Sequence, residues 1–170
     1  MASLMEELLD VLHQEKESYD ELLSLTDGKR ESIVNKDLDK LTSITNQEEE
    51  ISSRLKNLEN KTARILTDMS VVLGLDGDRA TVGQVIEKLA NQPEEQIRLT
   101  EARDSLVESA TKMQFMNQQN QILLQQALEM VEFDLTLFKS LRQAPETANY
   151  DKNAYNTGDL LGSGSFDFKQ

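Results

Sequence analysis

The chain has 170 residues, of which 38% are apolar, with no Cys, no Trp and a formal net charge of −13 at pH 7. This length favours one domain, or one domain followed by a tail. The absence of Cys excludes disulfides and thiolate chemistry, and because no segment is basic we expect no nucleic-acid partner. No apolar run reaches the roughly 18 residues of a membrane span, and the N-terminus is acidic where a signal peptide is basic. We therefore expect a cytoplasmic protein with no stable membrane insertion.

The first predicted helix covers residues 3–35. Ser3 and Glu6 have the spacing of a capping box, and Leu residues then recur at helical intervals as far as Leu25. Gly28 lies inside this pattern, where a glycine costs about 1 kcal/mol relative to Ala. This glycine could kink or end the helix, although we expect the helix to continue to about Val34. Asn35 or Asp37 would then cap the next helix.

The second predicted helix, residues 37–74, has the most regular pattern. Eight of its ten seam positions are apolar, and they alternate in steps of three and four as in a coiled coil. These positions are Leu41, Ile44, Glu48, Ile51, Leu55, Leu58, Thr62, Ile65, Met69 and Val72. Gly74 stands where a C-terminal glycine cap belongs. The loop at 74–80 faintly resembles the start of a calcium loop, but the later ligands are missing.

Two further helices are predicted, a short one at 81–91 capped by Thr81 and a long one at 94–142. The fold class is therefore all-α: an elongated antiparallel helical bundle with coiled-coil-like packing, three long helices and one short helix. The bundle would comprise residues 1–143. Residues 144–170 contain Gly, Ser, Asn and Asp without periodicity, which predicts a flexible, disordered C-terminal tail.

The middle of the last helix is unusually rich in amides. Eight of the eighteen residues at 114–131 are Asn or Gln, and two of them, Asn117 and Asn120, fall on the seam where Leu is expected. An Asn on such a seam costs stability but selects register and partner number. These amides would either organise a binding region for a partner helix or hold the bundle together internally. A third reading is that this part of the helix faces water and the amides are simply solvated.

Catalytic patterns are absent. His13 is the only His, and the stretch HQEKE has Glu17 where phosphotransfer domains have a glycine, so a phosphoryl group would be crowded and repelled. One His and no Cys cannot build a zinc or di-iron site, and the acidic run at 48–50 is typical of a solvated helix turn. No phosphate loop or nucleophile motif is present. We expect a protein that is not an enzyme and uses no metal or cofactor.

Three blocks, taken in order, resemble the FlgN-type flagellar export chaperones. The first, at 29–66, has a short polar link before Asp-Leu and then a Leu-x-x-Ile-x-x-x-Glu-Glu pattern. The second, at 81–99, is similar to the family's short Thr-capped helix with a Pro-Glu exit. The third, at 116–138, resembles the family's paired-Asn signature, with Met116 and Ala127 in place of the usual Leu and Ser.

The resemblance implies a cytoplasmic, non-catalytic chaperone of the flagellar type III secretion system. Its clients would be hook–filament junction proteins, held through their C-terminal helical regions and delivered to the export gate and its ATPase-associated components. The client-binding residues would lie in the C-terminal half. They are Asn117, Asn120, Leu123, Leu124, Leu128, Met130, Val131, Leu135 and Phe138. Tyr150 and Tyr155 in the tail would dock at the gate, although the tail departs from the family's Tyr–Gly spacing.

An alternative function is that of a self-associating structural coiled-coil protein. The regular seam of the helix at 37–74 is its main support, because such seams also drive homo-oligomers. This alternative predicts a stable homo-oligomer that needs no client.

Overall fold

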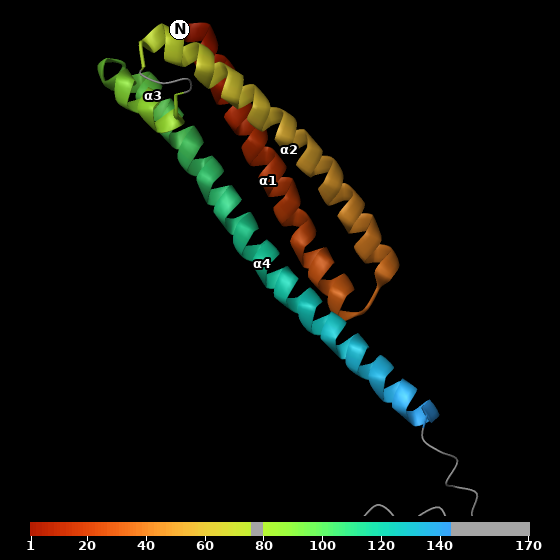
Figure 1. Cartoon of the computed structure of the whole chain (residues 1–170). Helices are drawn as coiled ribbons and strands as arrows, with labels where there is room; N and C mark the ends of the chain where they lie inside the picture. The colour runs from red at the N-terminus through yellow and green to blue at the C-terminus, as the bar shows by residue number, and fades with distance from the viewer. Residues whose placement is uncertain (76–79, 144–170) are drawn as a thin grey trace, which may run out of the picture. The chain divides into compact units, whose positions relative to one another are not determined.

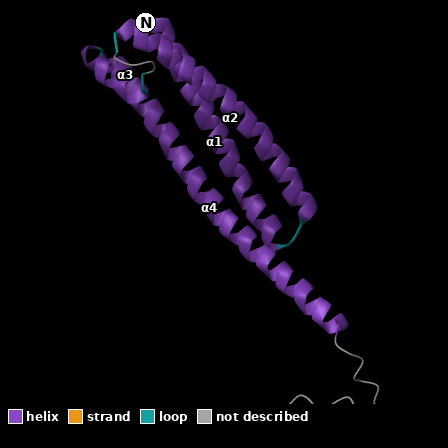
Figure 2. Ribbon diagram, viewed as in Figure 1, coloured by secondary structure: helices purple, strands orange, loops and turns teal. Residues whose placement is uncertain are grey.

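The computed structural model describes residues 1–75 and 80–143. The elements are α1 (Ala2–Val34), α2 (Leu38–Leu73), α3 (Val82–Lys88), the 3₁₀ turn η1 (Leu89–Asn91) and α4 (Pro93–Gln143), and no strand occurs in the described ranges (Figures 1 and 2). The prediction of an all-α bundle with three long helices and one short helix is confirmed. The predicted tail at 144–170 lies outside the described residues.

The chain divides into two compact units, Met1–Ala127 and Leu128–Gln170, and the division falls inside α4. The first unit contains α1, α2, α3, η1 and most of α4. The described part of the second unit is the helix Leu128–Gln143. The predicted division at residue 143 differs from this one and stays a prediction.

α1 and α2 form an antiparallel hairpin around a tight turn. Lys36 adopts a left-handed conformation (φ 55°), and the side chain of Asp37 caps α2 by accepting a hydrogen bond from the backbone N–H of Lys40 at 3.0 Å. Gly28 does not end α1, which is helical through to Val34. A Cβ atom at Gly28 would lie 3.3 Å from Cδ1 of Ile44, so the glycine lets α2 approach α1 closely.

The helix termini test three predicted caps. The predicted cap at Thr81 is confirmed: its side chain accepts from the backbone N–H of Gln84, whose side chain in turn accepts from the backbone N–H of Thr81, which completes a capping box. Gly74 ends α2 in the left-handed conformation, as predicted (φ 59°). The capping box at Ser3 is wrong: α1 already begins at Ala2, with no side-chain cap. The carboxylate of Glu6 is instead held by Arg98 at 2.8 and 3.0 Å.

The α2 seam follows the predicted positions for most of its length. Ile44, Ile51, Leu55, Ile65 and Met69 are buried, whereas Val72 is 54% exposed, so its assignment to the seam is wrong. In the last turns of α2, Leu66 and Ser70 are buried and Leu73 is half-buried. The reason is that these turns pack against α3 as well as α1, which moves the buried face around the helix.

The apolar core is concentrated where the four helices of the first unit meet. Its main cluster joins residues from α1, the end of α2, α3 with η1, and the start of α4: Met5, Leu8, Val11, Leu12, Ile65, Leu66, Met69, Ala80, Val85, Leu89 and Leu99. A smaller cluster of Leu22, Ile51 and Leu55 lies farther along the α1–α2 hairpin. The hairpin therefore has apolar clusters at two levels along its length, whereas α4 contributes one fully buried apolar side chain, Leu99.

Within the first unit, α4 runs parallel to α1 (Figure 1). Three polar contacts connect the two helices, and they follow the same order along each helix. They join Arg98 with Glu6, Ser109 with Asp20, and Asn120 with the backbone of Thr26. Ser109 and Asn120 are also the only buried residues of α4 besides Leu99. This arrangement places polar side chains at the α1–α4 contact where a coiled coil would have Leu.

Candidate functional site

The helix Leu128–Gln143 exposes every one of its side chains. Half of its sixteen residues are large and apolar, with exposed fractions from 40% at Val131 to 67% at Phe133 and Leu141. They are Leu128, Met130, Val131, Phe133, Leu135, Leu137, Phe138 and Leu141. Exposed apolar surface of this density is typical of a surface that binds a partner, so this helix is the candidate site.

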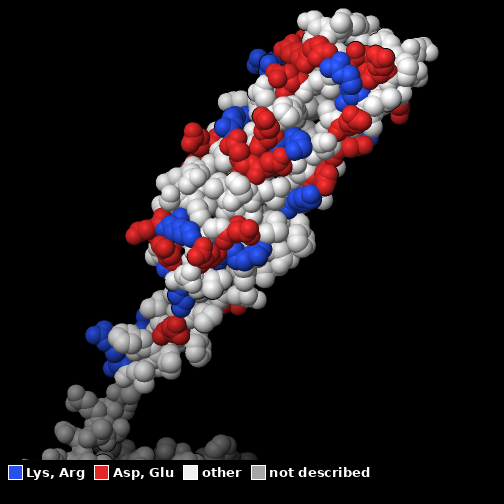
Figure 3. All heavy atoms as spheres, turned by 180° about the vertical axis from the view of Figure 1, so that it is seen from behind, with Lys and Arg blue, Asp and Glu red and all other residues white. Residues whose placement is uncertain are grey.

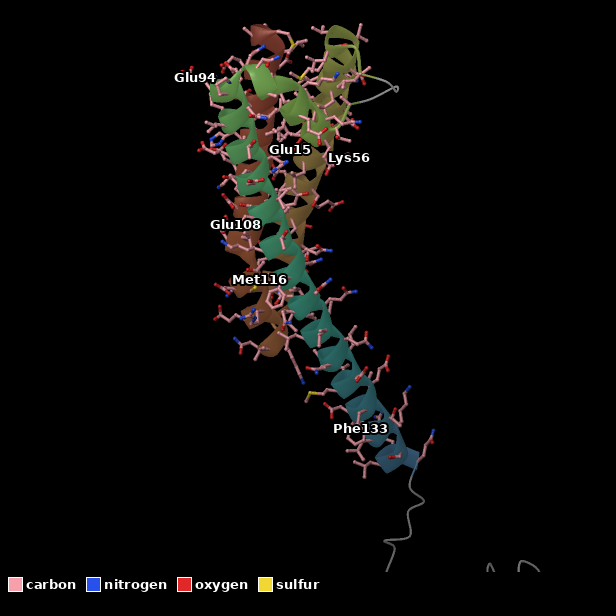
Figure 4. All side chains as sticks on the ribbon, turned by 90° about the vertical axis from the view of Figure 1, so that its left-hand side faces the viewer. Glu15, Lys56, Glu94, Glu108, Met116 and Phe133 are labelled. Carbon is pink, nitrogen blue, oxygen red and sulfur yellow. The ribbon has the colours of Figure 1, made fainter. Side chains whose placement is uncertain are left out.

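The exposed apolar side chains form two stripes along the helix. At about 100° per residue, a first stripe consists of Leu128, Val131, Leu135 and Phe138. A second stripe consists of Met130, Phe133, Leu137 and Leu141. Figure 4 shows side chains projecting from opposite sides of these turns, Phe133 among them. Two gaps separate the stripes around the helix. The narrow gap holds Asp134, and the broad gap is a polar face made of Glu129, Glu132, Thr136, Lys139, Ser140 and Gln143.

The charges of this helix are separated along its axis. The acids Glu129, Glu132 and Asp134 come first, and the bases Lys139 and Arg142 follow. The Arg142 guanidinium lies over the Phe138 ring, 5.3 Å from its centroid, in a cation–π contact. In contrast, acidic and basic side chains alternate over the rear surface of the first unit (Figure 3).

Four of the nine predicted client-binding residues lie on one stripe of this helix, and the other five lie elsewhere. Leu128, Val131, Leu135 and Phe138 share the first stripe, whereas Met130 lies on the second. Sequence reasoning missed Phe133, Leu137 and Leu141, because it followed one seam. Their spacing of four residues was a readable signal of a second apolar face.

The remaining predicted client-binding residues belong to the first unit. Leu123 and Leu124 are half-buried and Asn117 is exposed, whereas Asn120 is buried at 2% exposure. Nδ2 of Asn120 donates a hydrogen bond to the carbonyl oxygen of Thr26 at 3.1 Å, and its Oδ1 has no partner. Of the two Asn residues, then, Asn120 is bound to α1, whereas Asn117 is exposed.

Asn117 borders a groove of about 490 Å³ within the first unit. Tyr19 and Leu22 of α1 and Met113 of α4 contribute apolar surface, and Glu48 of α2 lies on its edge. Glu48 is held by Lys29, with 2.9 Å between Nζ and Oε2, and both side chains are largely buried. Burial raises the pKa of the Tyr19 hydroxyl, helped by the carboxylates of Glu59 and Glu15. This groove is open and polar-edged, and it contains no cluster of reactive groups.

Glu15 is the most buried carboxyl group among the described residues, at 7% exposure. Its Oε1 accepts a hydrogen bond from the Thr62 hydroxyl at 2.6 Å. Burial raises the pKa of Glu15, and the nearby Glu59 carboxylate acts in the same direction, while the bond from Thr62 opposes them. Sequence periodicity marked Thr62 as a seam position but missed Glu15, because a carboxylate in a helical pattern is normally assigned to the solvent face.

The residues considered for chemistry do not assemble. His13 is exposed and its Nε2 lies 3.2 Å from a carboxylate oxygen of Glu17, the residue expected to repel a phosphoryl group. In the described ranges, no three His, Cys, Asp or Glu side chains are grouped to hold a metal ion. Tyr150 and Tyr155, predicted to dock at the export gate, lie outside the described residues.

Comparison with known proteins identifies the family. The model of the family described as FlgN protein matches residues 1–158. The chain belongs to the FlgN family. The family resemblance on the three sequence blocks is thereby confirmed, and it associates this chain with the flagellar export chaperones. No curated protein and no solved structure matches the chain. None of the described helices is long and apolar enough to cross a membrane.

Proposed function

We propose that this FlgN-family protein is a cytoplasmic export chaperone of the flagellar type III secretion system. Its clients are hook–filament junction proteins, which it binds through their C-terminal helical regions and delivers to the export gate. The observation that carries the proposal is the helix Leu128–Gln143, whose eight large apolar side chains are all exposed. An apolar helix face of this kind is suited to an amphipathic partner helix.

The mechanism requires binding alone. A junction protein assembles through amphipathic terminal helices, and free helices of this kind associate with one another or are degraded. Covering them with the apolar side chains of α4 prevents premature assembly, and no nucleotide is needed. Release at the gate requires reversible binding, so affinity comes from a few apolar side chains, with Leu135 and Phe138 central among them.

The remaining predicted residues have supporting roles in this proposal. Asn117 and Asn120 organise the region next to the client-binding helix, and Leu123 and Leu124 flank it. Asn120 acts indirectly, since its side chain is bound to α1. Tyr150 and Tyr155 mediate docking at the export gate and its ATPase-associated components.

Isothermal titration against the C-terminal segment of the same organism's junction protein tests the proposal, together with light scattering after size exclusion. We expect a 1:1 complex with micromolar or tighter affinity, equivalent to at least about 8 kcal/mol. The double variant Tyr150→Ala/Tyr155→Ala is the matched control and should bind equally well, because the tail acts after capture. A stable homo-oligomer that does not bind the segment would instead support the structural coiled-coil alternative.

A further inference from the structure

The two stripes of the helix Leu128–Gln143 cover more of its circumference than one partner helix can reach. Each stripe spans about 80° in a helical projection, and their centres are about 140° apart. A helix packed on one side contacts an apolar band somewhat wider than about 100°. A single partner helix placed on Leu135 and Phe138 would therefore leave Phe133 and Leu137 in water.

The charges bordering the stripes define what such partners look like. Glu132 and Lys139 border the first stripe, and Asp134 lies between the two stripes. Charges at the edges of a helical seam select partner and orientation. Complementary helices would therefore carry basic residues opposite Glu132 and Asp134, and acidic residues opposite Lys139 and Arg142.

A second copy of this chain fits less well than a different protein. An antiparallel copy could pair Glu132 with Lys139 of the other molecule, but it would cover one stripe and leave the other exposed. Two chains that each carry a net charge of −13 also repel one another. The charge pattern and the two stripes together favour a partner that supplies both helices itself.

We propose that Leu128–Gln143 is clasped by two amphipathic helical segments of one client molecule, one on each stripe. The inference rests on the proposed function and adds to it the form of the client: two helices, of which the C-terminal segment is one. In the complex, this part of α4 becomes the central helix of a three-helix assembly.

Affinity measurements on three full-length variants test the inference, with the complete junction protein as the probe. The first is Val131→Gln/Leu135→Gln/Phe138→Gln in the first stripe, and the second is Met130→Gln/Phe133→Gln/Leu137→Gln in the second stripe. The control, Thr136→Gln/Ser140→Gln, changes the polar face of the same turns. Because Gln is a good helix former, circular dichroism should show unchanged helix content in all three.

We expect each stripe variant to weaken binding by roughly tenfold or more and the control to bind like the unmodified chain. A photo-crosslinking amino acid at Leu135 should label one segment of the client, and the same amino acid at Phe133 should label a different segment. Wild-type affinity in the second-stripe variant, or labelling of a single segment from both positions, would overturn the two-helix inference and leave the proposed function intact.

Two other outcomes would show that no junction protein, or a second copy of this chain, binds the two stripes. If the unmodified chain does not bind the junction protein, the proposed function is wrong and the inference is wrong with it. If light scattering shows a stable dimer that both stripe variants abolish, a second copy of this chain occupies the stripes, and the two-helix client is excluded.

Discussion

Glu15 and Asn120 show how individual polar residues shape the interior of the first unit. Both are buried in seams that would otherwise be apolar, and each makes one hydrogen bond to a neighbouring helix. The partnerless Oδ1 of Asn120 costs about 1–3 kcal/mol, and the Glu15 carboxylate loses hydration on burial, so each of these residues reduces the stability of the bundle. Both positions therefore allow a substitution that stabilises the fold.

Replacing Glu15 by Gln should raise stability at pH 7. The pKa of Glu15 is raised above its ordinary value of 4.5 by burial, so the folded state binds its proton more tightly than the unfolded state. The stability of the native chain therefore rises as the pH falls from neutral through the folded pKa, and this contribution levels off near pH 4.5. Glu15→Gln cannot ionise and should lose this dependence while still accepting a hydrogen bond from Thr62.

Thermal unfolding between pH 5 and pH 7 measures the effect of Glu15. The variant should be more stable than the native chain at pH 7, and the difference should shrink towards pH 5. Glu49→Gln, at an exposed position of α2, is the matched control for the loss of one carboxylate. The lowered pKa of Asp20, caused by hydrogen bonds from Lys16 and Ser109, acts below its ordinary value of 3.8 and so outside this range. A Glu15→Gln variant less stable than the native chain at pH 7 would contradict the prediction.

Asn120→Leu should stabilise the first unit by about 1 kcal/mol in urea unfolding followed by circular dichroism. The substitution removes the partnerless Oδ1, and the Thr26 carbonyl stays within the hydrogen-bonded part of α1. Asn117→Leu, at an exposed position three residues away, should change stability by less than about 0.5 kcal/mol. A destabilised Asn120→Leu variant would show that the amide contributes more to the α1–α4 contact than its single observed bond.

At the scale of elements, α2 and α4 are attached to α1 by different means. α2 buries five of its predicted seam residues, among them Ile51 and Leu55. α4 instead makes polar contacts at Asp20 and Thr26 of α1 and inserts Leu99 into the core where α1, α2 and α3 meet. Leu99 is the one fully buried apolar side chain of the longest helix, and the half-buried Ala102, Leu106 and Met113 pack against the same clusters beside it.

Leu99→Ala should destabilise the first unit by about 2–5 kcal/mol, the usual cost of removing a fully buried Leu side chain. Leu99 has 0% exposure, whereas Ile97, two residues earlier on the same helix, is 57% exposed. Ile97→Ala should therefore cost less than about 0.5 kcal/mol. Urea unfolding of both variants measures the difference, and equal losses would mean that Leu99 is not the main attachment point of α4.

At the scale of the whole molecule, sequence reasoning predicted the helices well and the polar interior poorly. Apolar periodicity and caps such as Asp37 and Thr81 are local signals, so helix limits were predicted within a few residues. Glu15 and Ser109 were missed, because their burial depends on which helix packs beside them. The second stripe was missed for a related reason: a helix with apolar residues on two sides has no single face that a periodicity search can follow.

The seam positions of α4 also change phase at the limit between the two units. The seam positions are Met113, Asn117, Asn120, Leu124, Leu128, Val131, Leu135 and Phe138. They alternate in steps of four and three, except that two consecutive steps of four run from Asn120 through Leu124 to Leu128. In a coiled coil such an insertion is a stutter, which locally unwinds the left-handed supercoil. A helix that packed along α4 past Asn120 in one continuous left-handed supercoil would thus drift off the first stripe. A helix that binds the first stripe must therefore begin a new supercoil at Leu128, and a separate protein can provide such a helix.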